Sequence, residues 1–520
     1  MSNKVGRRSF LKGAAIGGAA VASSSLAMDL GFSREAKAAA KLRALPTKWD
    51  ETFDVVVIGS GFAGFAAGAE AAKTGASTII LEKMPTYGGN SIIDGGLYAA
   101  WDSELHLRQK LGYGDDSAAL HTKDTILGGD EFPIPELAKI LAEGASDALN
   151  WMINEGGCKI KPVLAKAGGH SAYRTHICEE YNGRGYVEPL HRIALKYGCP
   201  EPRLQTEVTW IWRAVEGGPV LGVEVKTGGA GRSGGKVSNI KVNRALVLAS
   251  GGFSRDLKMR TDHYPYLKES FLSTNHKGAT GEIIRFSQNI GADTLQMNFI
   301  QLYPYAEPES GVLDEAGLYP FNGPGAGVVY VTKDGKRFVS EQERRDVVSF
   351  AQLKLGDANK PTYSIFNLEM LQKIGAEQKN LDAFVAKKRI VVSDTVGGVA
   401  DQLKINRAAL EETIQKHNGY LKSGKDLEFN KPITPQMVNL EKGPYYGVPQ
   451  WPAVHHTMGG LRINAKGQVI DVFGEVIPKL YAAGEVCGGV HGSNRLGSNA
   501  IPDATVFGRV AGRNAAAEKS

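Results

Sequence analysis

The pattern of apolar positions is clearest near the start of the chain. A β-branched run at 54–58 predicts a buried parallel strand. A glycine-rich turn follows, and an alanine-rich segment at 65–74 predicts a helix that stops at Gly75. A second apolar run at 77–81 predicts another strand. Strand, turn, helix and strand in this order are typical of an α/β fold.

The turn after the first predicted strand has the spacing G-x-G-x-x-G, formed by Gly59, Gly61 and Gly64. Gly59 permits a tight turn, Gly61 lets the backbone approach a pyrophosphate, and Gly64 lets helix and strand pack closely. The following helix directs its N-terminus at the phosphates. Glu82 ends the second strand, 18 residues past Gly64, where it would accept hydrogen bonds from a ribose. This context favours a dinucleotide site over a turn that binds nothing.

The remaining pattern divides the chain further. Residues 103–200 are predicted to be mostly helical, and strands are predicted at 206–211, 220–225 and 244–253, with a hairpin tip at 228–235. Residues 300–453 have strands and helices of their own, including a tight turn at 333–338. We therefore predict one domain made of 50–299 and 454–517, with 300–453 inserted between its parts.

Length, hydropathy and charge limit the class of protein. A chain of 520 residues is too long for one hydrophobic core, which agrees with two domains. No stretch is apolar enough to predict a membrane span. Residues 1–40 carry six basic and two acidic side chains, so they hold +4 of the formal +6 and leave about +2 for the rest. A general nucleic-acid surface is therefore not indicated.

The first forty residues are typical of an export signal. Arg7-Arg8-Ser-Phe-Leu-Lys12 is a twin-arginine pattern, a weakly apolar run follows at 13–27, and Ala36-Lys-Ala38 offers a cleavage site. The alternative is a disordered basic N-terminus. The twin-arginine route carries folded proteins, so we expect a periplasmic protein that collects a non-covalent cofactor before export.

The four cysteines, Cys158, Cys178, Cys199 and Cys487, form neither C-x-x-C nor the C-x-x-C-H of haem attachment. Their spacing offers no metal site. A disulfide stays open in an oxidising compartment, but free thiols of mixed burial are the favoured interpretation.

Several blocks resemble one family. Gly88-Gly-Asn-Ser91 followed by Gly95-Gly96 is similar to the second FAD loop of the fumarate reductase flavoproteins, the branch related to soluble flavocytochromes c. The blocks His-His-Thr-Met-Gly-Gly at 455–460, Ala-Gly-Glu at 483–485 and Asn-Arg-Leu-Gly-Ser-Asn-Ala at 494–500 resemble the same family, over about residues 52–517. The resemblance implies a Rossmann-like FAD-binding domain with an inserted α+β capping domain and no haem domain. The family includes fumarate, acrylate, methacrylate and urocanate reductases.

The resemblance also implies which residues bind the cofactor. The set expected to contact FAD is Gly59, Gly61, Ala63, Gly64, Glu82, Asn90, Ser91, Gly95, Gly96, Val208, Glu282, His455, Glu485, Ala500 and Ile501. Glu282 departs from the family pattern, which has Asp followed by Gly. FAD is expected to be non-covalent, because the second loop lacks the histidine that covalent members use.

By the same resemblance, Arg495 and His456 would hold a substrate carboxylate, and Arg345 would be the proton donor. Hydride from flavin N5 would attack the β carbon, and fixed cations would stabilise the charge that develops beside the carboxylate. Without the family blocks, a surface arginine, a structural histidine and a solvated charged helix would be the simpler interpretations of these residues.

The substrate pocket departs from the fumarate pattern. Tyr303 stands where the family has a histidine, Pro320-Phe321 where it has Thr-Glu, and Pro324 where it has the outer arginine of the proton relay. A second buried carboxylate would lack partners there. We therefore expect an acrylate-like or arylacrylate-like monocarboxylate, bound by Tyr303, Phe321, Gly96 and Ser498, while fumarate stays an alternative.

No second G-x-G-x-x-G occurs in a strand–helix context, which argues against direct use of NAD(P)H. Together with the missing haem motif, this predicts a separate periplasmic c-type cytochrome as electron donor. Two other functions stay open. One is a dehydrogenase of the ketosteroid 1-dehydrogenase type, since Tyr303 and Tyr319 are present; the other is a flavin carrier without turnover.

Overall fold

The computed structural model describes residues 42–228 and 235–519, so the predicted twin-arginine signal and residues 229–234 of the predicted hairpin tip lie outside the described residues. Two hydrophobic cores organise these residues. One gathers side chains from before Tyr303 and after Ala453, and the other gathers mainly those between them. The boundaries predicted at 299/300 and 453/454 stay predictions.

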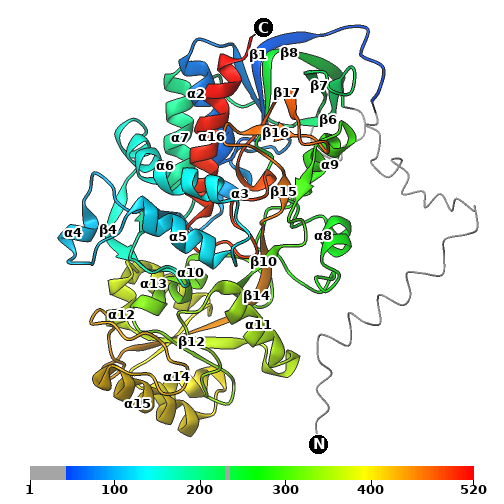
Figure 1. The fold of residues 1–520 in the computed structure, drawn as a ribbon. Helices are drawn as coiled ribbons and strands as arrows, with labels where there is room; N and C mark the ends of the chain where they lie inside the picture. The colour runs from blue at the N-terminus through cyan, green and yellow to red at the C-terminus, as the bar shows by residue number, and fades with distance from the viewer. Residues whose placement is uncertain (1–41, 229–234, 520) are drawn as a thin grey trace, which may run out of the picture. The chain divides into compact units, whose positions relative to one another are not determined.

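A parallel group of strands forms the centre of the larger sheet (Figure 1). These strands are β1 (Glu51–Ile58), β2 (Thr78–Leu81), β8 (Val237–Leu248) and β17 (Val476–Ala482). β1 lies between β2 and β8, so Val55, Val56 and Val57 are completely buried. Burial on both faces explains why this run is apolar without alternation. The predicted α/β class and the strands at 54–58 and 77–81 are confirmed.

Antiparallel strands extend this sheet at its sides. They are β6 (Thr206–Arg213), β7 (Val220–Thr227) and β16 (Gln468–Ile470). The strands predicted at 206–211 and 220–225 are confirmed. β8 begins seven residues before the predicted start at 244, because its first half pairs with β7.

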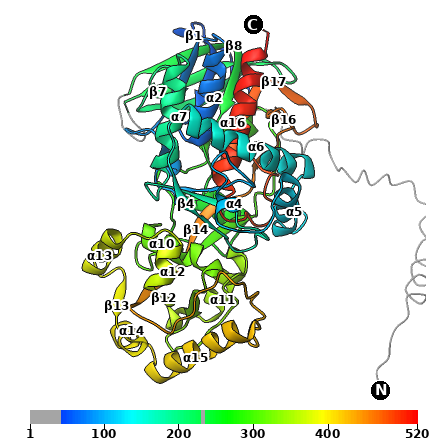
Figure 2. The same cartoon turned by 90° about the vertical axis from the view of Figure 1, so that its left-hand side faces the viewer.

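Helices cover the parallel strands (Figure 2). They are α2 (Phe62–Lys73), α6 (Pro135–Asn154), α7 (Arg184–Lys196) and α16 (Ala500–Ala517). The predicted first helix is confirmed and begins three residues earlier, at Phe62. α2 and α16, from opposite ends of the sequence, pack backbone to backbone: a Cβ on Gly512 would lie 2.4 Å from the carbonyl oxygen of Ala67.

The prediction that 103–200 is mostly helical is wrong in part. A three-stranded sheet interrupts its helices, ordered β3-β5-β4, with β3 (Leu97–Ala99), β4 (Ile160–Ala165) and β5 (Thr175–Cys178). The helices of this range besides α6 and α7 are α4 (Leu107–Lys110) and α5 (Ala118–Gly128), and α3 (Gly89–Ile92) precedes it. Residues 175–178 are completely buried but too few to show a period.

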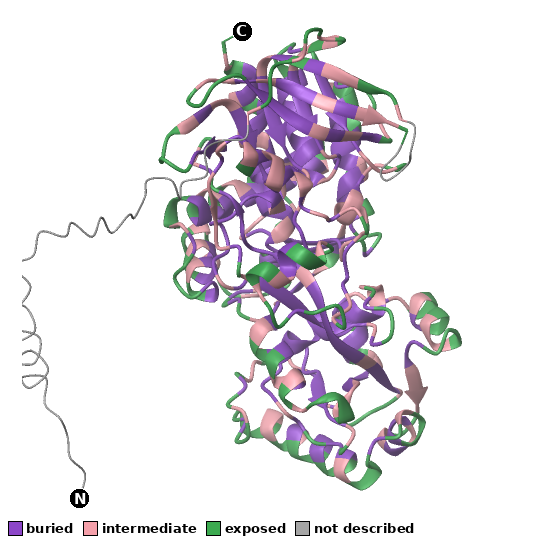
Figure 3. Ribbon diagram, turned by 90° about the vertical axis from the view of Figure 1, so that its right-hand side faces the viewer, coloured by how far each residue is buried: buried purple, intermediate pink, exposed green. Residues whose placement is uncertain are grey.

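The inserted segment, which we call the cap, has its own antiparallel sheet ordered β10-β14-β12-β11, with β13 paired to β14. Its strands are β10 (Ile300–Ala306), β11 (Val329–Val331), β12 (Thr362–Asn367), β13 (Val391–Ser393) and β14 (Tyr445–Thr457). The turn predicted at 333–338 is confirmed, because Thr332 N donates to Lys336 O at 3.0 Å. Figure 3 shows buried strands at the centre of the cap and exposed faces on its outer helices.

The cap helices are α10 (Glu315–Asn322), α11 (Arg345–Lys354), α12 (Leu368–Lys373), α13 (Gln378–Ala386), α14 (Val396–Leu403) and α15 (Arg407–Ser423), with 3-10 turns η2 (Gly323–Gly325) and η3 (Asp357–Asn359). The remaining elements of the first domain are α8 (Leu257–His263), α9 (Glu282–Asn289), β9 (Thr294–Leu295), β15 (Gly460–Leu461) and η4 (Gly484–Val486).

β10 and β14 join the two parts. They pair side by side, and their paired ends place Gln301 opposite His456 at the edge of the first domain. The rest of β14 pairs with β12 inside the cap. The strands β10 and β14, which pack in the cap core, therefore also carry residues of the site described below.

Three further observations concern only the described residues. No helix there is long and apolar enough to cross a membrane, and no cluster of candidate metal ligands occurs. All four cysteines are free and buried, so the expectation of mixed burial is wrong.

Candidate active site

A long cavity runs along the carboxyl ends of the parallel strands. It encloses about 1460 Å³, part of it open to solvent, and extends from the glycine turn after β1 to Arg495. A cleft at this edge of an α/β sheet is where dinucleotides bind. Predicted residues on its wall are Gly59, Gly61, Ala63, Glu82, Asn90, Ser91, Val208, Glu282, His455, His456, Glu485, Arg495 and Ala500.

The glycine turn forms one end of this cavity. Gly59 has φ +101°, and a Cβ there would lie 2.3 Å from the carbonyl oxygen of Ala249. A Cβ on Gly61 would lie 2.7 Å from Ser91 Oγ, which accepts the backbone N–H of Phe62 at 3.0 Å. No side chain caps α2, so its remaining first-turn N–H groups face the cavity and suit a pyrophosphate.

Two carboxylates lie on the same side of the cavity. Glu82, at the end of β2, accepts Ser60 Oγ at 2.6 Å and Met84 N at 2.9 Å. Glu282, at the start of α9, accepts Lys83 Nζ at 3.0 Å and also Thr280 Oγ1. Both acids are thus held in one orientation, and Glu82 lies where a ribose is expected.

Eight predicted residues do not line the cavity: Arg345, Tyr303 and Phe321, which are described below, and five others. Gly64 packs against Gly59, and a Cβ on Gly96, at φ +60°, would lie 2.5 Å from Cys178 Sγ. Ser498 Oγ lies 3.0 Å from Thr175 Oγ1 instead of facing the cavity. Gly95 and Ile501 likewise lie behind the lining residues. These positions shape the wall through packing.

Two buried arginines meet at one amide. Arg345 Nη1 donates to Gln301 Oε1 at 3.1 Å, and Arg495 Nη2 donates to the same oxygen at 3.0 Å. Gln301 in turn donates its amide to Asn494 Oδ1 at 2.9 Å and to the carbonyl oxygen of Arg495 at 2.7 Å. Within 42–228 and 235–519, neither guanidinium forms an ion pair, and Nε of each has no partner.

Burial without a counter-ion is costly for a cation. Burial lowers the pKa of Arg345 to about 10 and lowers that of Arg495 well below its usual value. The positive charge of the Arg345 guanidinium also disfavours charge on Arg495. The two side chains together form a site with unsatisfied affinity for an anion.

Aromatic rings enclose Arg345. Its guanidinium carbon lies 5.0 Å from the centre of the Tyr303 ring and 4.6 Å from that of Phe321. The Tyr303 hydroxyl points away and donates to Gly317 O at 2.7 Å. Tyr303 and Phe321 are 1% and 3% exposed, so the rings present apolar surface beside the arginine.

The two histidines are neutral. Burial, followed by the charges of the nearby arginines, lowers the pKa of both His455 and His456 well below the usual value. His455 Nδ1 lies 2.7 Å from Thr274 Oγ1, and its ring centre is 4.9 Å from that of Tyr303. His456 Nδ1 lies 3.7 Å from Glu485 Oε1 and next to Arg495 along the cavity wall.

Sequence reasoning missed Gln301 and Asp94. Asp94 lines the cavity and accepts the Gly96 N–H at 2.6 Å; burial raises its pKa to about 7. Asp94 lies inside the loop that resembles the second FAD loop of the family, so its position in the sequence could have identified it as a site residue. Gln301 precedes Tyr303 by two residues, and the alternation of a strand places both on one face.

The arrangement can bind a dinucleotide and, at its end, an anion. The anion would meet two cationic groups and a neutral histidine, with apolar rings on the other side. Such a site suits a small carboxylate with an apolar substituent.

Comparisons with known proteins agree with this chemistry. The FAD binding domain family model matches residues 54–501. Urocanate reductase of Eggerthella lenta is 36% identical over 467 residues, covering 89% of this chain and 74% of that protein. The acrylate reductase flavoprotein subunit of Shewanella woodyi is 34% identical and covers 99% of each chain. The open conformation of a flavocytochrome c3 fumarate reductase superposes with a TM-score of 0.68 at 33% identity, over 90% of this chain and 79% of that one.

Proposed function

The chain belongs to the FAD-binding, fumarate reductase-like flavoproteins, which reduce the C=C bond of unsaturated carboxylates, and from this premise we propose that its substrate is an α,β-unsaturated monocarboxylate with an apolar or aromatic substituent. One observation carries the proposal. Arg345 and Arg495 converge on Gln301 without an acid, and Arg345 is enclosed by Tyr303 and Phe321.

The residues present fit FAD. Side chains cannot occupy the turn at Gly59 and Gly61 without displacing backbone or Ser91, and the uncapped start of α2 offers N–H groups to a pyrophosphate. Glu82 would hold the ribose. Bound FAD would supply the hydride equivalent for the C=C bond.

Arg495 and His456 would hold the substrate carboxylate. A guanidinium donates two parallel hydrogen bonds to a carboxylate, and His456 can donate one more as a neutral imidazole. Gln301 keeps Arg495 oriented before substrate arrives, so no reorganisation is needed when negative charge grows beside the carboxylate.

Arg345 would deliver the proton to the α carbon. An arginine is an unusual acid because its pKa is normally above 12. Here burial lowers that pKa to about 10, which brings it closer to the working range of a general acid. Gln301 holds the Nη1 end of the side chain in place.

Tyr303 and Phe321 would select the substrate. A second carboxylate placed against them would lose its hydration without gaining a hydrogen bond, which costs several kcal/mol. An apolar or aromatic substituent would instead bury its surface against the same rings. This disfavours fumarate relative to acrylate-like and arylacrylate-like compounds.

The test is anaerobic oxidation of reduced methyl viologen by the FAD-loaded protein, with fumarate, acrylate, methacrylate, cinnamate and urocanate supplied separately. We expect a monocarboxylate to react fastest, Arg345→Ala to abolish the reaction, and Tyr303→Phe, which keeps the ring, to preserve the preference. If fumarate reacts fastest, the substrate class is wrong. If no enoate oxidises the dye, the proposed reductase activity is wrong, and a dehydrogenase or a flavin carrier becomes the favoured function.

We further propose export by the twin-arginine route to the periplasm, with a separate c-type cytochrome as electron donor. Arg7 and Arg8 in their sequence context support the first part, and the absence of C-x-x-C-H from the sequence supports the second. Arg7→Lys/Arg8→Lys should leave the protein in the cytoplasmic fraction. Reduced periplasmic cytochrome should be oxidised only when both enzyme and enoate are present.

A further inference from the structure

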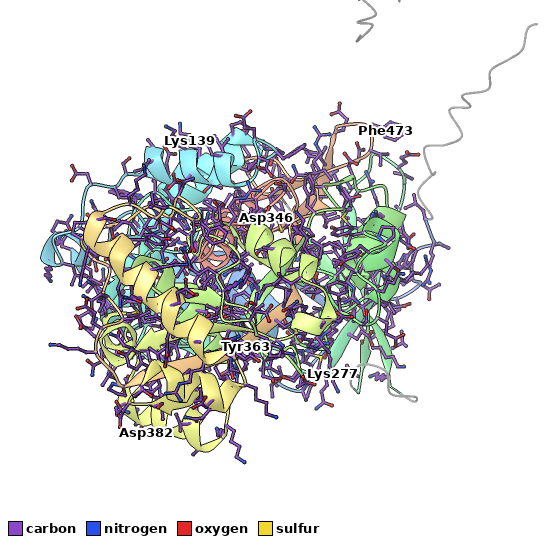
Figure 4. All side chains as sticks on the ribbon, turned by 90° about the horizontal axis from the view of Figure 1, so that it is seen from below. Lys139, Lys277, Asp346, Tyr363, Asp382 and Phe473 are labelled. Atoms are coloured by element: carbon purple, nitrogen blue, oxygen red, sulfur yellow. The ribbon has the colours of Figure 1, made fainter. Side chains whose placement is uncertain are left out.

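Asp130 joins two segments that are distant from each other in the sequence. Its Oδ1 accepts Arg344 Nη1 at 2.5 Å, and its Oδ2 accepts Arg344 Nη2 at 3.1 Å and Ser493 Oγ at 2.5 Å. Arg344 belongs to the cap and is also held by Asp346 at the start of α11, which Figure 4 labels. Ser493 belongs to the loop before α16 in the first domain.

Both partners of Asp130 are close neighbours of the two site arginines. Arg344 immediately precedes Arg345, and Ser493 lies two residues before Arg495. One carboxylate therefore binds the side chain of a close neighbour of each arginine. A displacement of about 1 Å in such groups is enough to lower a rate substantially.

The turn around Asp130 is built for this contact. Gly128 O accepts Asn494 Nδ2 at 3.1 Å, and Gly129 O accepts Ser493 N at 3.2 Å. A Cβ on Gly129 would lie 2.2 Å from the carbonyl oxygen of His491, so only glycine permits this approach. Asn494 then accepts the amide of Gln301, which holds both arginines.

Local forces alone would not place an acid at this position. Asp130 follows the C-terminus of α5, where the helix dipole disfavours negative charge. Its φ of 56° is in the left-handed region, which is unfavourable for most non-glycine residues. The Arg344 guanidinium offsets both effects and holds the pKa of Asp130 below its usual range.

The contact is also accessible to solvent. The side chains of Asp130 and Arg344 are 47% and 22% exposed, so water and salt compete with the pair. An ion pair of this exposure stabilises the contact between the cap and the first domain only weakly.

We propose that Asp130 is a positioning residue, an ionic clasp that couples the cap to the loop before α16 and places Arg345 and Arg495 at the same time. The proposal rests on the proposed function for its kinetic effect, but the contact itself has a readout that does not require turnover. Asp130 touches neither cofactor nor substrate in this account.

The test compares Asp130→Asn with Asp401→Asn in the FAD-loaded enzyme. Asp401 forms a more exposed pair with Arg407 inside the cap, 3.0 Å apart, and serves as the control. We expect Asp130→Asn to lower kcat about fivefold, the upper range for an exposed pair, and Asp401→Asn to leave it unchanged. Asp130→Glu, which keeps the carboxylate, should recover most of the loss.

Hydrogen exchange gives the readout independent of turnover. In Asp130→Asn, exchange should increase in both 342–350 and 490–499, and added salt should raise wild-type exchange toward that of the variant. If only residues beside Asp130 change, or if Asp130→Glu recovers nothing, the clasp is refuted. If exchange changes in both segments but no enoate is reduced, the clasp stands and the proposed function fails.

Discussion

Two buried groups of charged side chains differ in whether their cations form ion pairs with acids. The cap cluster consists of Arg337, Glu341, Asp426 and Lys431, all at most 8% exposed. Arg337 donates to both oxygens of Glu341 at 2.8 Å and to Asp426, and Lys431 Nζ lies 3.1 Å from Glu341. Two cations therefore face two acids. At the active site, Arg345 and Arg495 are equally buried, but share one neutral amide oxygen.

The pKa shifts record this difference. Burial alone would lower the pKa of Arg337, but Glu341 and Asp426 outweigh burial and raise it. Arg345 has no such acid, so burial lowers its pKa to about 10. A buried cation that is paired with an acid has its charge neutralised within the fold. A buried cation that is bound only by a neutral amide can still bind an anion or transfer a proton.

The largest predicted effect removes an unpaired cation. Arg495→Gln should lower enoate reduction by about a thousandfold, because fixed stabilisation of the developing charge is lost. It should lower the free energy of unfolding less than Arg337→Met does, because Arg495 forms no ion pair with the acids near it. Dye oxidation and urea unfolding measure the two quantities. A marked loss of stability would mean that Arg495 has a structural partner after all.

The opposite outcome is expected in the cap cluster. Arg337→Met should lower the free energy of unfolding by about 3–5 kcal/mol, because it leaves Glu341 and Asp426 with a single cation. Urea unfolding measures this, and Arg407→Met, on the exposed face of α15, serves as control. A loss equal to that of the control would show that the cluster is not a stabilising unit.

Anion binding offers a third comparison. A saturated monocarboxylate at about 100 times its Kd should stabilise the FAD-loaded wild type by about 2.7 kcal/mol. Thermal unfolding should show the shift in wild type and Arg337→Met, but not in Arg495→Gln. An equal shift in all three would place the anion elsewhere.

The last prediction concerns Asp94. Because burial raises its pKa to about 7, the folded state holds this proton more tightly than the unfolded state does. Stability of the FAD-free protein should therefore fall as pH rises from about 4 through about 7. Asp94→Asn should unfold at a higher temperature than wild type, by a margin that grows over this range and is then constant. A margin independent of pH would contradict the raised pKa.

Local patterns predicted the first part of the fold well. The apolar run, the three glycines and Glu82 act within one strand–turn–helix–strand unit, so neighbours along the chain determine the outcome. Burial of Arg345 is different. Its own segment, Glu-Gln-Glu-Arg-Arg-Asp, is typical of a solvated helix, and packing by Tyr303 and Phe321 removes the Arg345 side chain from water.

The same reasoning explains what was missed. Gln301 is significant only because Arg345 and Arg495 reach it from two distant segments. Strands β4 and β5 carry no period that distinguishes them from short helices. Gly96 and Ser498 were expected to bind substrate, but Cys178 and Thr175, brought close by the fold, hold them behind the wall.

The length of β14 has a practical consequence for protein engineering. A single strand, Tyr445–Thr457, carries pairing inside the cap at one end and His455 and His456 at the other. A graft that exchanged caps between relatives by cutting at 453 would split this strand in the middle. Chimeras joined before Ile300 and after Thr457 would move the strand pair intact and carry Gln301, Tyr303 and both histidines with the donor. Substrate preference should then be inherited as a module with the cap.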